Sequence, residues 1–149
     1  MSRSVLFVCL GNICRSPLAE GVAKAKAKQK NLAITIASAG LSRYHNGEAP
    51  CLVSQKLAKR HGVDISTIRS EHISQFDLNS FDLVVALDES NKQELLALGV
   101  QNVKKLGDFG FNGKDVADLY YEPHKEKEVW EMIDRATSLI LEELSSSSE

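Results

Sequence analysis

The amino-acid sequence predicts a single α/β domain built around a parallel β-sheet. Short apolar, β-rich segments alternate with segments of helical character, which is the pattern of strands joined by right-handed crossovers. A length of 149 residues suits one domain, and 43% hydrophobic against 26% charged residues is ordinary for a globular protein. No internal repeat and no linker rich in Gly, Pro or Ser interrupts the sequence. We therefore expect one domain over residues 1–149.

The first predicted strand is the apolar run Ser4–Cys9. A continuous run of this kind is typical of a strand that is buried on both faces of a sheet. A helix is predicted from Leu18 to about Gln29, with Ser16 as its N-cap and Pro17 at its first position. Cys9 is therefore expected at the carboxyl end of a strand and close to a helix N-terminus, where α/β sheets bind their ligands.

The remaining elements continue the alternation. Gly62 and Gly99 would end the second and third helices. One apolar face of the last helix is expected to be buried, namely Val129, Ile133, Ala136, Ile140 and Leu144. The further strands are predicted at Ala33–Ala37, Phe81–Leu87 and Val103–Leu106, the further helices at Cys51–His61, Ser90–Leu98 and Lys125–Leu144, and a frayed tail at residues 145–149.

The charge balance excludes several classes of partner. Eighteen Lys and Arg against twenty Asp and Glu give a net charge of −2, which provides no electrostatic footprint for nonspecific nucleic-acid binding. The longest stretch without a charge, Asn31–Ser42, is too short and too polar to span a bilayer. Gly11, Asn12 and Arg15 interrupt any secretory signal at the start of the chain. We expect a cytoplasmic protein with neither a nucleic-acid nor a membrane partner.

The cysteines favour a reduced thiol protein without a disulfide framework. There are three of them, Cys9, Cys14 and Cys51, and an odd, small number does not suit such a framework. The four histidines are scattered singly and lie outside metal-ligand spacing, so we expect no metal and no cofactor. In that setting, an unpaired cysteine in an ordered loop is a candidate nucleophile.

The segment Cys9–Pro17 predicts a phosphate-binding loop. Gly11 and Asn12 tolerate left-handed conformations, so that successive N–H groups can converge on one anion in front of the helix dipole. Arg15 adds a planar fork that matches two phosphate oxygens, and this positive field favours the thiolate form of Cys9. A buried cysteine and a surface arginine are common by themselves, but they would leave the Gly, Asn, Ser and Pro unexplained. Neither nucleotide-binding glycine motif occurs in this loop.

The segment Val8–Pro17 resembles the phosphate loop of the low-molecular-weight protein tyrosine phosphatases. The similarity continues through Ser38–Gly40, Phe81–Asp82, Ala86–Asn91 and Asp118–Tyr121, and so spans nearly the whole domain. The resemblance implies a four-stranded parallel sheet flanked by helices on both faces, with the phosphate loop between the first strand and the first helix. It also implies metal-free hydrolysis of aryl phosphomonoesters in phosphotyrosine-containing proteins, with release of inorganic phosphate. We expect a monomer or a weak homodimer.

The resemblance also implies roles for individual residues. Cys9 corresponds to the nucleophile, Arg15 to the phosphate clamp and Asp118 to the general acid. Asn12 and Ser16 would hold the loop and stabilise the thiolate, and Ser38 would contact Asn12. The residues expected to bind substrate are Leu10, Gly11, Asn12, Ile13, Cys14 and Ser16 of the loop and Tyr44, Tyr120 and Tyr121 at the pocket mouth.

Some assignments stay open at this point. Asp108 and Asp115 lie in the same region as Asp118, and only the Asp-x-Tyr-Tyr context selects Asp118 as the acid. Asp88 is as consistent with a capping residue as with a site residue. The family usually has proline where this chain has Leu119, which leaves the rigidity of that loop open. The arginine-rich stretch of the family is altered to Arg69–His72.

Three other functions fit the sequence less well than phosphotyrosine hydrolysis. Thioredoxin-coupled arsenate reductases resemble the loop but need further downstream cysteines, and Cys51 is alone in a different segment. Protein-arginine phosphatases typically carry Thr at the position of Ile13, so Ile13 favours an aromatic phosphoester. A module that binds phosphotyrosine without turnover would be expected to lack the acid, and Asp118 argues against it.

Cys14 suggests redox control, because it lies in the same loop as Cys9. Peroxide could convert Cys9 to a sulfenic acid that Cys14 captures as a disulfide. The alternative is that Cys14 only packs under the loop.

Overall fold

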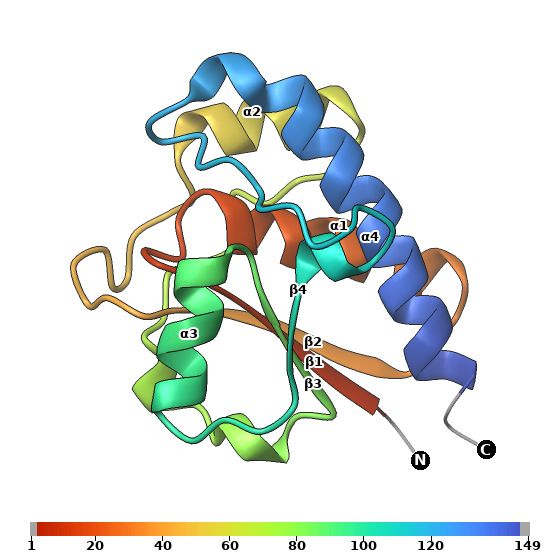
Figure 1. Cartoon of the computed structure of the whole chain (residues 1–149). Coiled ribbons are helices and arrows are strands. Elements are labelled where there is room, and N and C mark those ends of the chain that lie inside the picture. The colour runs from red at the N-terminus through yellow and green to blue at the C-terminus, as the bar shows by residue number, and fades with distance from the viewer. Residues whose placement is uncertain (1–2, 147–149) are drawn as a thin grey trace.

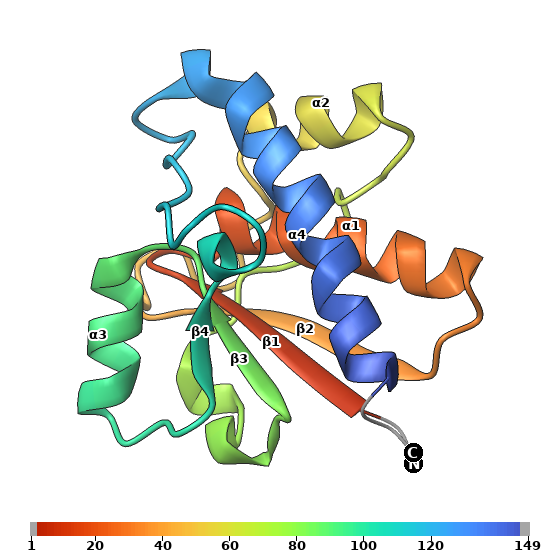
Figure 2. The same ribbon diagram turned by 45° about the vertical axis from the view of Figure 1, so that its right-hand side comes forward.

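A four-stranded parallel sheet with helices on both faces forms the centre of the protein (Figure 1). The computed structural model describes residues 3–146. All neighbouring strands pair in parallel, in the order β2–β1–β3–β4, which Figure 2 shows. The predicted fold class is confirmed. The strands are β1 (Arg3–Cys9), β2 (Ile34–Gly40), β3 (Leu83–Ala86) and β4 (Val103–Lys105).

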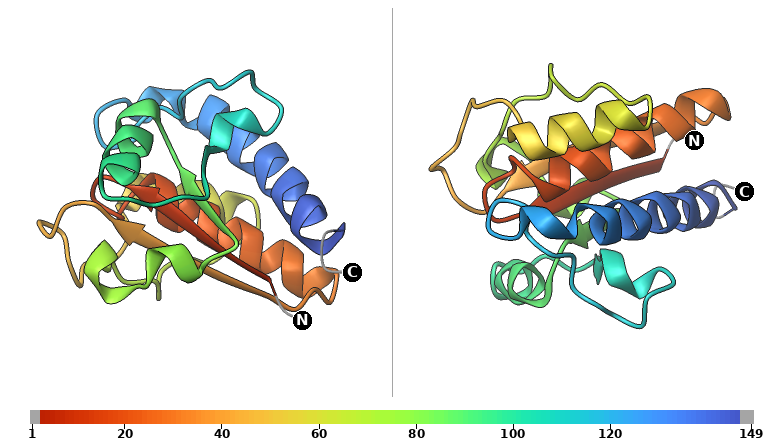
Figure 3. Two further views of the ribbon diagram at one scale, coloured as in Figure 1. Left: turned by 60° about the horizontal axis from the view of Figure 1, so that its bottom comes forward. Right: turned by 90° about the horizontal axis from the view of Figure 1, so that it is seen from above.

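The helices divide unequally between the two faces of the sheet. On one face lie α1 (Arg15–Gln29), α2 (Leu52–Arg60) and α4 (Glu126–Ser146), and Figure 3 shows α1 and α4 side by side. The other face carries α3 (Glu89–Ala97) and two 3₁₀ turns. The sheet is therefore covered on both sides, as a parallel sheet requires.

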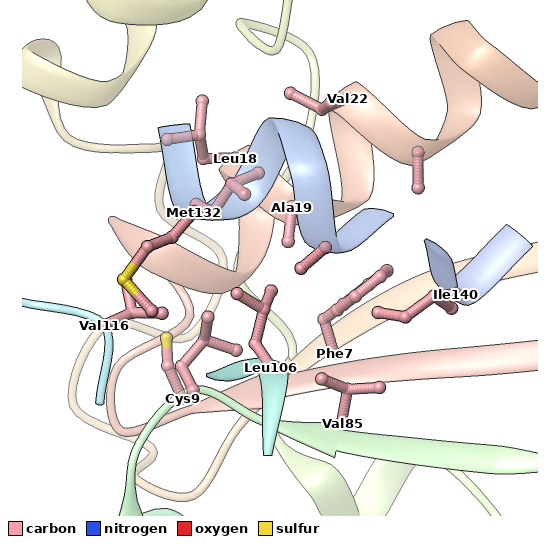
Figure 4. Packing of buried hydrophobic residues seen from close by; sticks show 14 of the residues in the cluster. Phe7, Cys9, Leu18, Ala19, Val22, Val85, Leu106, Val116, Met132 and Ile140 are labelled. Atoms are coloured by element: carbon pink, nitrogen blue, oxygen red, sulfur yellow. The ribbon is translucent and has the colours of Figure 1, made fainter. Parts of the chain in front are cut away.

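Alternating side chains of β1 enter two separate apolar clusters. Val5, Phe7 and Cys9 join the larger cluster, which packs under α1 and α4, and Leu6 and Val8 join the smaller cluster under α3. All five are almost fully buried, as the continuous apolar run predicts. Figure 4 shows the larger cluster, with Cys9 at its edge. The carboxyl end of β1 is thereby anchored in the core.

The predicted start of α1 is wrong. The helix begins at Arg15, with Cys14 in the N-cap position and no side-chain cap, so Pro17 is its third residue and Ser16 is not its N-cap. Proline is tolerated there because the first turn has no intrahelical acceptor for its N–H. The hydroxyl of Ser16 instead contacts Cys9 and Asn12.

The other helix boundaries lie close to the predictions. Gly62 and Gly99 follow the ends of α2 and α3 as predicted, and both adopt a left-handed conformation (φ 78° and φ 87°). Helix α3 begins one residue earlier than predicted, because the carboxylate of Asp88 accepts the N–H of Asn91 at 2.8 Å and caps it.

The last helix, α4, is longer than predicted. It runs to Ser146, so the first two residues of the expected frayed tail are helical, and residues 147–149 lie outside the described part. Its predicted apolar face is buried throughout. None of the helices within residues 3–146 is long and apolar enough to cross a membrane.

Candidate active site

A pocket of about 420 Å³ opens at the carboxyl edge of the sheet. Three chain segments far apart in the sequence form it: the loop after β1, the loop after β2 and the segment that precedes α4 (Figure 1). Its volume is in the range of ordinary small-ligand sites. The lining residues are Cys9, Leu10, Gly11, Ile13, Cys14 and Arg15, then Ser42, Tyr44 and His45, and finally Asp118, Tyr120 and Tyr121.

The loop after β1 wraps around the sulfur of Cys9. The backbone N–H of Asn12 donates to Cys9 Sγ at 3.2 Å, and Ser16 Oγ lies 3.0 Å from the same sulfur. Asn12 adopts a left-handed conformation (φ 55°), which asparagine tolerates better than most residues. Because Cys9 is only 3% exposed, these two donors supply the polar contacts that water cannot.

Arg15 lies beside this sulfur with its guanidinium almost fully buried. Its Nη1 donates to Asp88 Oδ2 at 2.7 Å and to the carbonyl oxygen of Val116 at 3.1 Å, and its Nη2 lies 3.5 Å from Asp118 Oδ2. Among the described residues, these contacts use three of the five N–H groups of the Arg15 guanidinium. Its Nε–H and one N–H of Nη2 remain to bind two oxygens of an oxyanion.

Electrostatics keep Arg15 charged. Burial alone would lower the pKa of its guanidinium, but the charges of Cys9, Asp88 and Asp118 and the hydrogen bond to Asp88 outweigh burial, and the pKa is raised. The pocket therefore combines a buried fixed cation with a thiol.

Asp88 has both of the roles that the sequence left open. One carboxylate oxygen, Oδ1, accepts the N–H of Asn91 and caps α3, while the other, Oδ2, accepts from Arg15. The start of α3 and the orientation of the guanidinium thus depend on one side chain.

A buried polar network supports the loop from below. The side-chain amide of Asn12 donates to Ser16 Oγ at 2.8 Å and to Ser38 Oγ at 2.9 Å, and its oxygen accepts the N–H of Glu71 at 2.9 Å. Ser38, at the end of β2, in turn donates to the carboxylate of Glu20. The structure therefore brings Ser38 to Asn12, the contact that the resemblance implies, and adds Glu20, which sequence reasoning missed.

The three candidate aspartates lie in different surroundings. Asp118 lines the pocket, with Oδ2 toward Arg15 and Oδ1 accepting the N–H of Tyr120 at 3.0 Å. Asp115 instead accepts from the Lys105 ammonium and the N–H of Glu89, and Asp108 accepts the N–H of Lys105. Neither Asp115 nor Asp108 is among the residues that line the pocket.

Aromatic rings form the rim of the pocket. Tyr44, Tyr120 and Tyr121 are all largely exposed, and His45 joins them into a row with ring centroids 4.7 Å from Tyr44 and 6.2 Å from Tyr120. Sequence reasoning missed His45 and Ser42. The available signal was their position beside Tyr44 in the loop that follows β2. Such a rim can contact the flat face of an aryl group.

The cysteine prediction is wrong in one respect: Cys14 and Cys51 form a disulfide. The two residues are 37 positions apart, and the start of α2 brings them together, with the N–H of Cys51 donating to the carbonyl of Ile13 at 2.7 Å. Cys14 is therefore bonded to Cys51 and not to Cys9, which is a free thiol. Spacing alone could not reveal this contact, because it depends on packing between α2 and the loop.

Metal ligands are not grouped in the described part of the chain. Among residues 3–146, no three His, Cys, Asp or Glu side chains lie close enough together to hold a metal ion.

Comparison with known proteins identifies relatives along the whole chain. A profile described as "Low molecular weight phosphotyrosine protein phosphatase" matches residues 4–149. The low molecular weight protein-tyrosine-phosphatase YfkJ of Bacillus subtilis is 34% identical over 98% of each chain, and its crystal structure superposes with a TM-score of 0.92 at 32% identity over 100% of this chain and 98% of that chain. The human low molecular weight phosphotyrosine protein phosphatase is 41% identical over 63% of this chain and 60% of its own length. The structure of a Drosophila arginine phosphatase gives a TM-score of 0.85 at 28% identity over 97% of this chain and 99% of that chain.

Proposed function

Since this chain belongs to the low-molecular-weight phosphotyrosine protein phosphatase family, we propose that it hydrolyses aryl phosphomonoesters through a cysteinyl-phosphate intermediate. As a member of that family, it is a protein-tyrosine phosphatase. The observation that carries the proposed mechanism is the position of the Cys9 sulfur, beside the buried Arg15 cation and under hydrogen bonds from the loop. We propose phosphotyrosine-containing proteins as its substrates.

In the first step, the Cys9 thiolate attacks phosphorus and the phenolate leaves. Arg15 binds two of the phosphoryl oxygens through its free edge, and the loop N–H groups stabilise the charge on the equatorial oxygens. Asp118, which faces the pocket beside Arg15, donates its proton to the leaving oxygen. The product of this step is cysteinyl phosphate with Asp118 as a carboxylate.

In the second step, water hydrolyses the intermediate. The Asp118 carboxylate removes a proton from the water as it attacks phosphorus, and inorganic phosphate leaves. Ser16 and the N–H of Asn12 stabilise the departing thiolate through the contacts they already make with Cys9. No metal takes part in either step as we propose it.

The substrate class follows from the shape and polarity of the pocket. Ile13 contributes an apolar side chain to the pocket, and Tyr44, Tyr120 and Tyr121 extend the aromatic surface at its mouth. A phenyl ring can pack between these groups, whereas a guanidinium beside Ile13 would find no hydrogen-bond acceptor on that side chain. This arrangement favours phosphotyrosine over phosphoarginine.

Turnover of p-nitrophenyl phosphate in EDTA tests the proposal. We expect wild-type protein to hydrolyse it, and Cys9→Ser to lose activity by about four orders of magnitude or more, because the hydroxyl is a far weaker nucleophile. Far-UV circular dichroism checks that the variant folds, and Cys51→Ser in dithiothreitol is the matched control. Substantial turnover by folded Cys9→Ser would overturn the mechanism.

A further inference from the structure

The Cys14–Cys51 disulfide joins the loop that carries the candidate nucleophile to the residue before α2. Cys9 and Cys14 line the same pocket, while Cys51, the residue that precedes α2, reaches Cys14 from outside the pocket. We propose that Cys14 and Cys51 form a reversible redox site that receives the oxidation of Cys9 by hydroperoxides and returns Cys9 to its thiolate form. This proposal rests on the proposed function only in treating Cys9 as the reactive thiolate.

The protein holds these two cysteines together by contacts other than the disulfide. The N–H of Cys51 donates to the carbonyl of Ile13 at 2.7 Å, and Ser54 Oγ donates to the carbonyl of Cys14 at 2.9 Å. The same hydroxyl lies 3.2 Å from Cys51 Sγ. The Cα atoms of Cys14 and Cys51 are 5.4 Å apart, which is the ordinary separation for a disulfide. We therefore expect the two thiols to stay adjacent after reduction.

Exposure and position give the three sulfurs different roles. Cys9 Sγ accepts the N–H of Asn12 and lies in the pocket beside Arg15, so it is the sulfur that meets a hydroperoxide entering the pocket and attacks it as a thiolate. Cys14 follows in the same loop and faces the same pocket. Cys51 is only partly buried, and the hydrogen bond from its backbone N–H to the carbonyl of Ile13 holds it next to Cys14. Oxidation can thus begin at Cys9 and end as the Cys14–Cys51 disulfide.

The proposed sequence has three balanced steps. The Cys9 thiolate attacks the hydroperoxide and breaks the O–O bond, which gives a Cys9 sulfenic acid. The leaving hydroxide of hydrogen peroxide, or the leaving alkoxide of an alkyl hydroperoxide, takes up a proton to form water or an alcohol. The Cys14 thiol then attacks the sulfenic sulfur, forming a Cys9–Cys14 disulfide with loss of water. Finally the Cys51 thiolate attacks Cys14 Sγ, forming the Cys14–Cys51 disulfide and releasing the Cys9 thiolate.

The net reaction oxidises two thiols to one disulfide and reduces one peroxide. Cys9 does not advance to the irreversible sulfinic acid, because its sulfenic acid is consumed inside the loop. A dithiol such as dithiothreitol then reduces Cys14–Cys51 by thiol–disulfide exchange and restores the starting state. Cys9 is therefore a free thiolate both before the peroxide reacts and after the last step.

The test follows the three sulfurs by mass spectrometry of alkylated peptides. Protein reduced by dithiothreitol and desalted is treated with one equivalent of hydrogen peroxide and then with iodoacetamide. We expect wild-type protein to form Cys14–Cys51 while Cys9 is alkylated. In Cys9→Ala, formation of this disulfide should slow by about tenfold or more, because the sulfur that first reacts with the peroxide in the proposed sequence is absent.

A second variant traps the intermediate. In Cys51→Ser, the oxidation should stop at Cys9–Cys14, and phosphatase activity should fall by at least about tenfold until dithiothreitol restores it. The same variant kept in dithiothreitol should match wild-type turnover, which shows that its fold and pocket are intact. Cys51→Ala provides an independent substitution at the same position.

Two results would overturn the proposal. One is formation of Cys14–Cys51 at the wild-type rate in Cys9→Ala, because oxidation would then not pass through Cys9. The other is an alkylated Cys9 in peroxide-treated Cys51→Ser and Cys51→Ala. Mass spectrometry of the three sulfurs gives a readout that does not depend on phosphate hydrolysis. Normal disulfide transfer together with full turnover by Cys9→Ser would therefore contradict the proposed function and leave the redox site standing.

Discussion

The two halves of the pocket are built in opposite ways. The phosphate loop is buried and hydrogen-bonded: Asn12 is 1% exposed and Ser16 is fully buried, and both contact the sulfur of Cys9. The rim is exposed, with 82% of Tyr44 and 73% of Tyr121 accessible to solvent. The loop is thus preorganised for one small anion, whereas the rim can change without disturbing the core. We therefore expect changes in the loop to affect the chemical step and changes in the rim to affect its fit to the leaving group.

Arg15→Lys should have the largest effect among the following variants. A lysine ammonium is a point charge that cannot donate two parallel hydrogen bonds to a phosphate, and it would leave Asp88 Oδ2 or the Val116 carbonyl without a partner. We expect kcat for p-nitrophenyl phosphate to fall by about 10²–10³-fold. Steady-state kinetics measure this loss, and Arg60→Lys, on an exposed arginine of α2, is the matched control. An unchanged rate would mean that Arg15 is not the phosphate clamp.

Asp118→Asn tests the pocket carboxylate assigned to proton transfer. An amide cannot protonate a leaving group, so we expect phenyl phosphate hydrolysis to slow by about 10²-fold and p-nitrophenyl phosphate hydrolysis to slow less, because nitrophenolate leaves without protonation. Asp115→Asn is the matched control, since Asp115 is bound to Lys105 outside the pocket. Equal losses for the two substrates would assign the acid to another residue.

Ser38→Ala tests whether the hydrogen bonds beneath the phosphate loop affect catalysis, because Ser38 does not line the pocket. Removing the hydroxyl deprives the Asn12 amide of an acceptor and the Glu20 carboxylate of a donor. We expect kcat to fall by about tenfold and the free energy of unfolding to fall by about 1–3 kcal/mol. Kinetics and urea unfolding measure the two effects, with Ser80→Ala on the surface as the control. A stability loss with unchanged kcat would show that Ser38 serves the fold alone.

Leu119→Pro should change activity least. Leu119 is the second residue of a turn in which the carbonyl of Asp118 accepts the N–H of Tyr121 at 3.1 Å, a position that favours proline. We expect kcat to stay within about twofold of wild type or to rise, because the turn becomes stiffer. The buried leucine side chain is lost, however, so the free energy of unfolding should fall by about 1–3 kcal/mol. A tenfold drop in kcat would show that the acid loop needs the backbone freedom of leucine.

The sequence predicts the buried half of the molecule better than the parts that depend on distant contacts. The order of elements and the burial of β1 follow from local apolar patterns, and the left-handed Asn12 follows from its residue type. The prediction that Ser16 caps α1 is wrong, because its hydroxyl contacts the Cys9 sulfur instead of the helix end. The Cys14–Cys51 disulfide has no local signal, because only the packing of α2 on the loop creates it.

The end of β2 limits how this protein can evolve. A Cβ atom at Gly40 would lie 3.1 Å from the carbonyl carbon of Gly11 and 3.2 Å from the backbone nitrogen of Asn12. These are backbone atoms of the phosphate loop, so a side chain at position 40 would require that loop to shift by a few tenths of an ångström. In a library of random variants selected for activity, substitutions at position 40 should therefore be depleted, although Gly40 does not line the pocket. Position 44, by contrast, lies on the exposed rim, so substitutions there should be tolerated and could change which substrates fit.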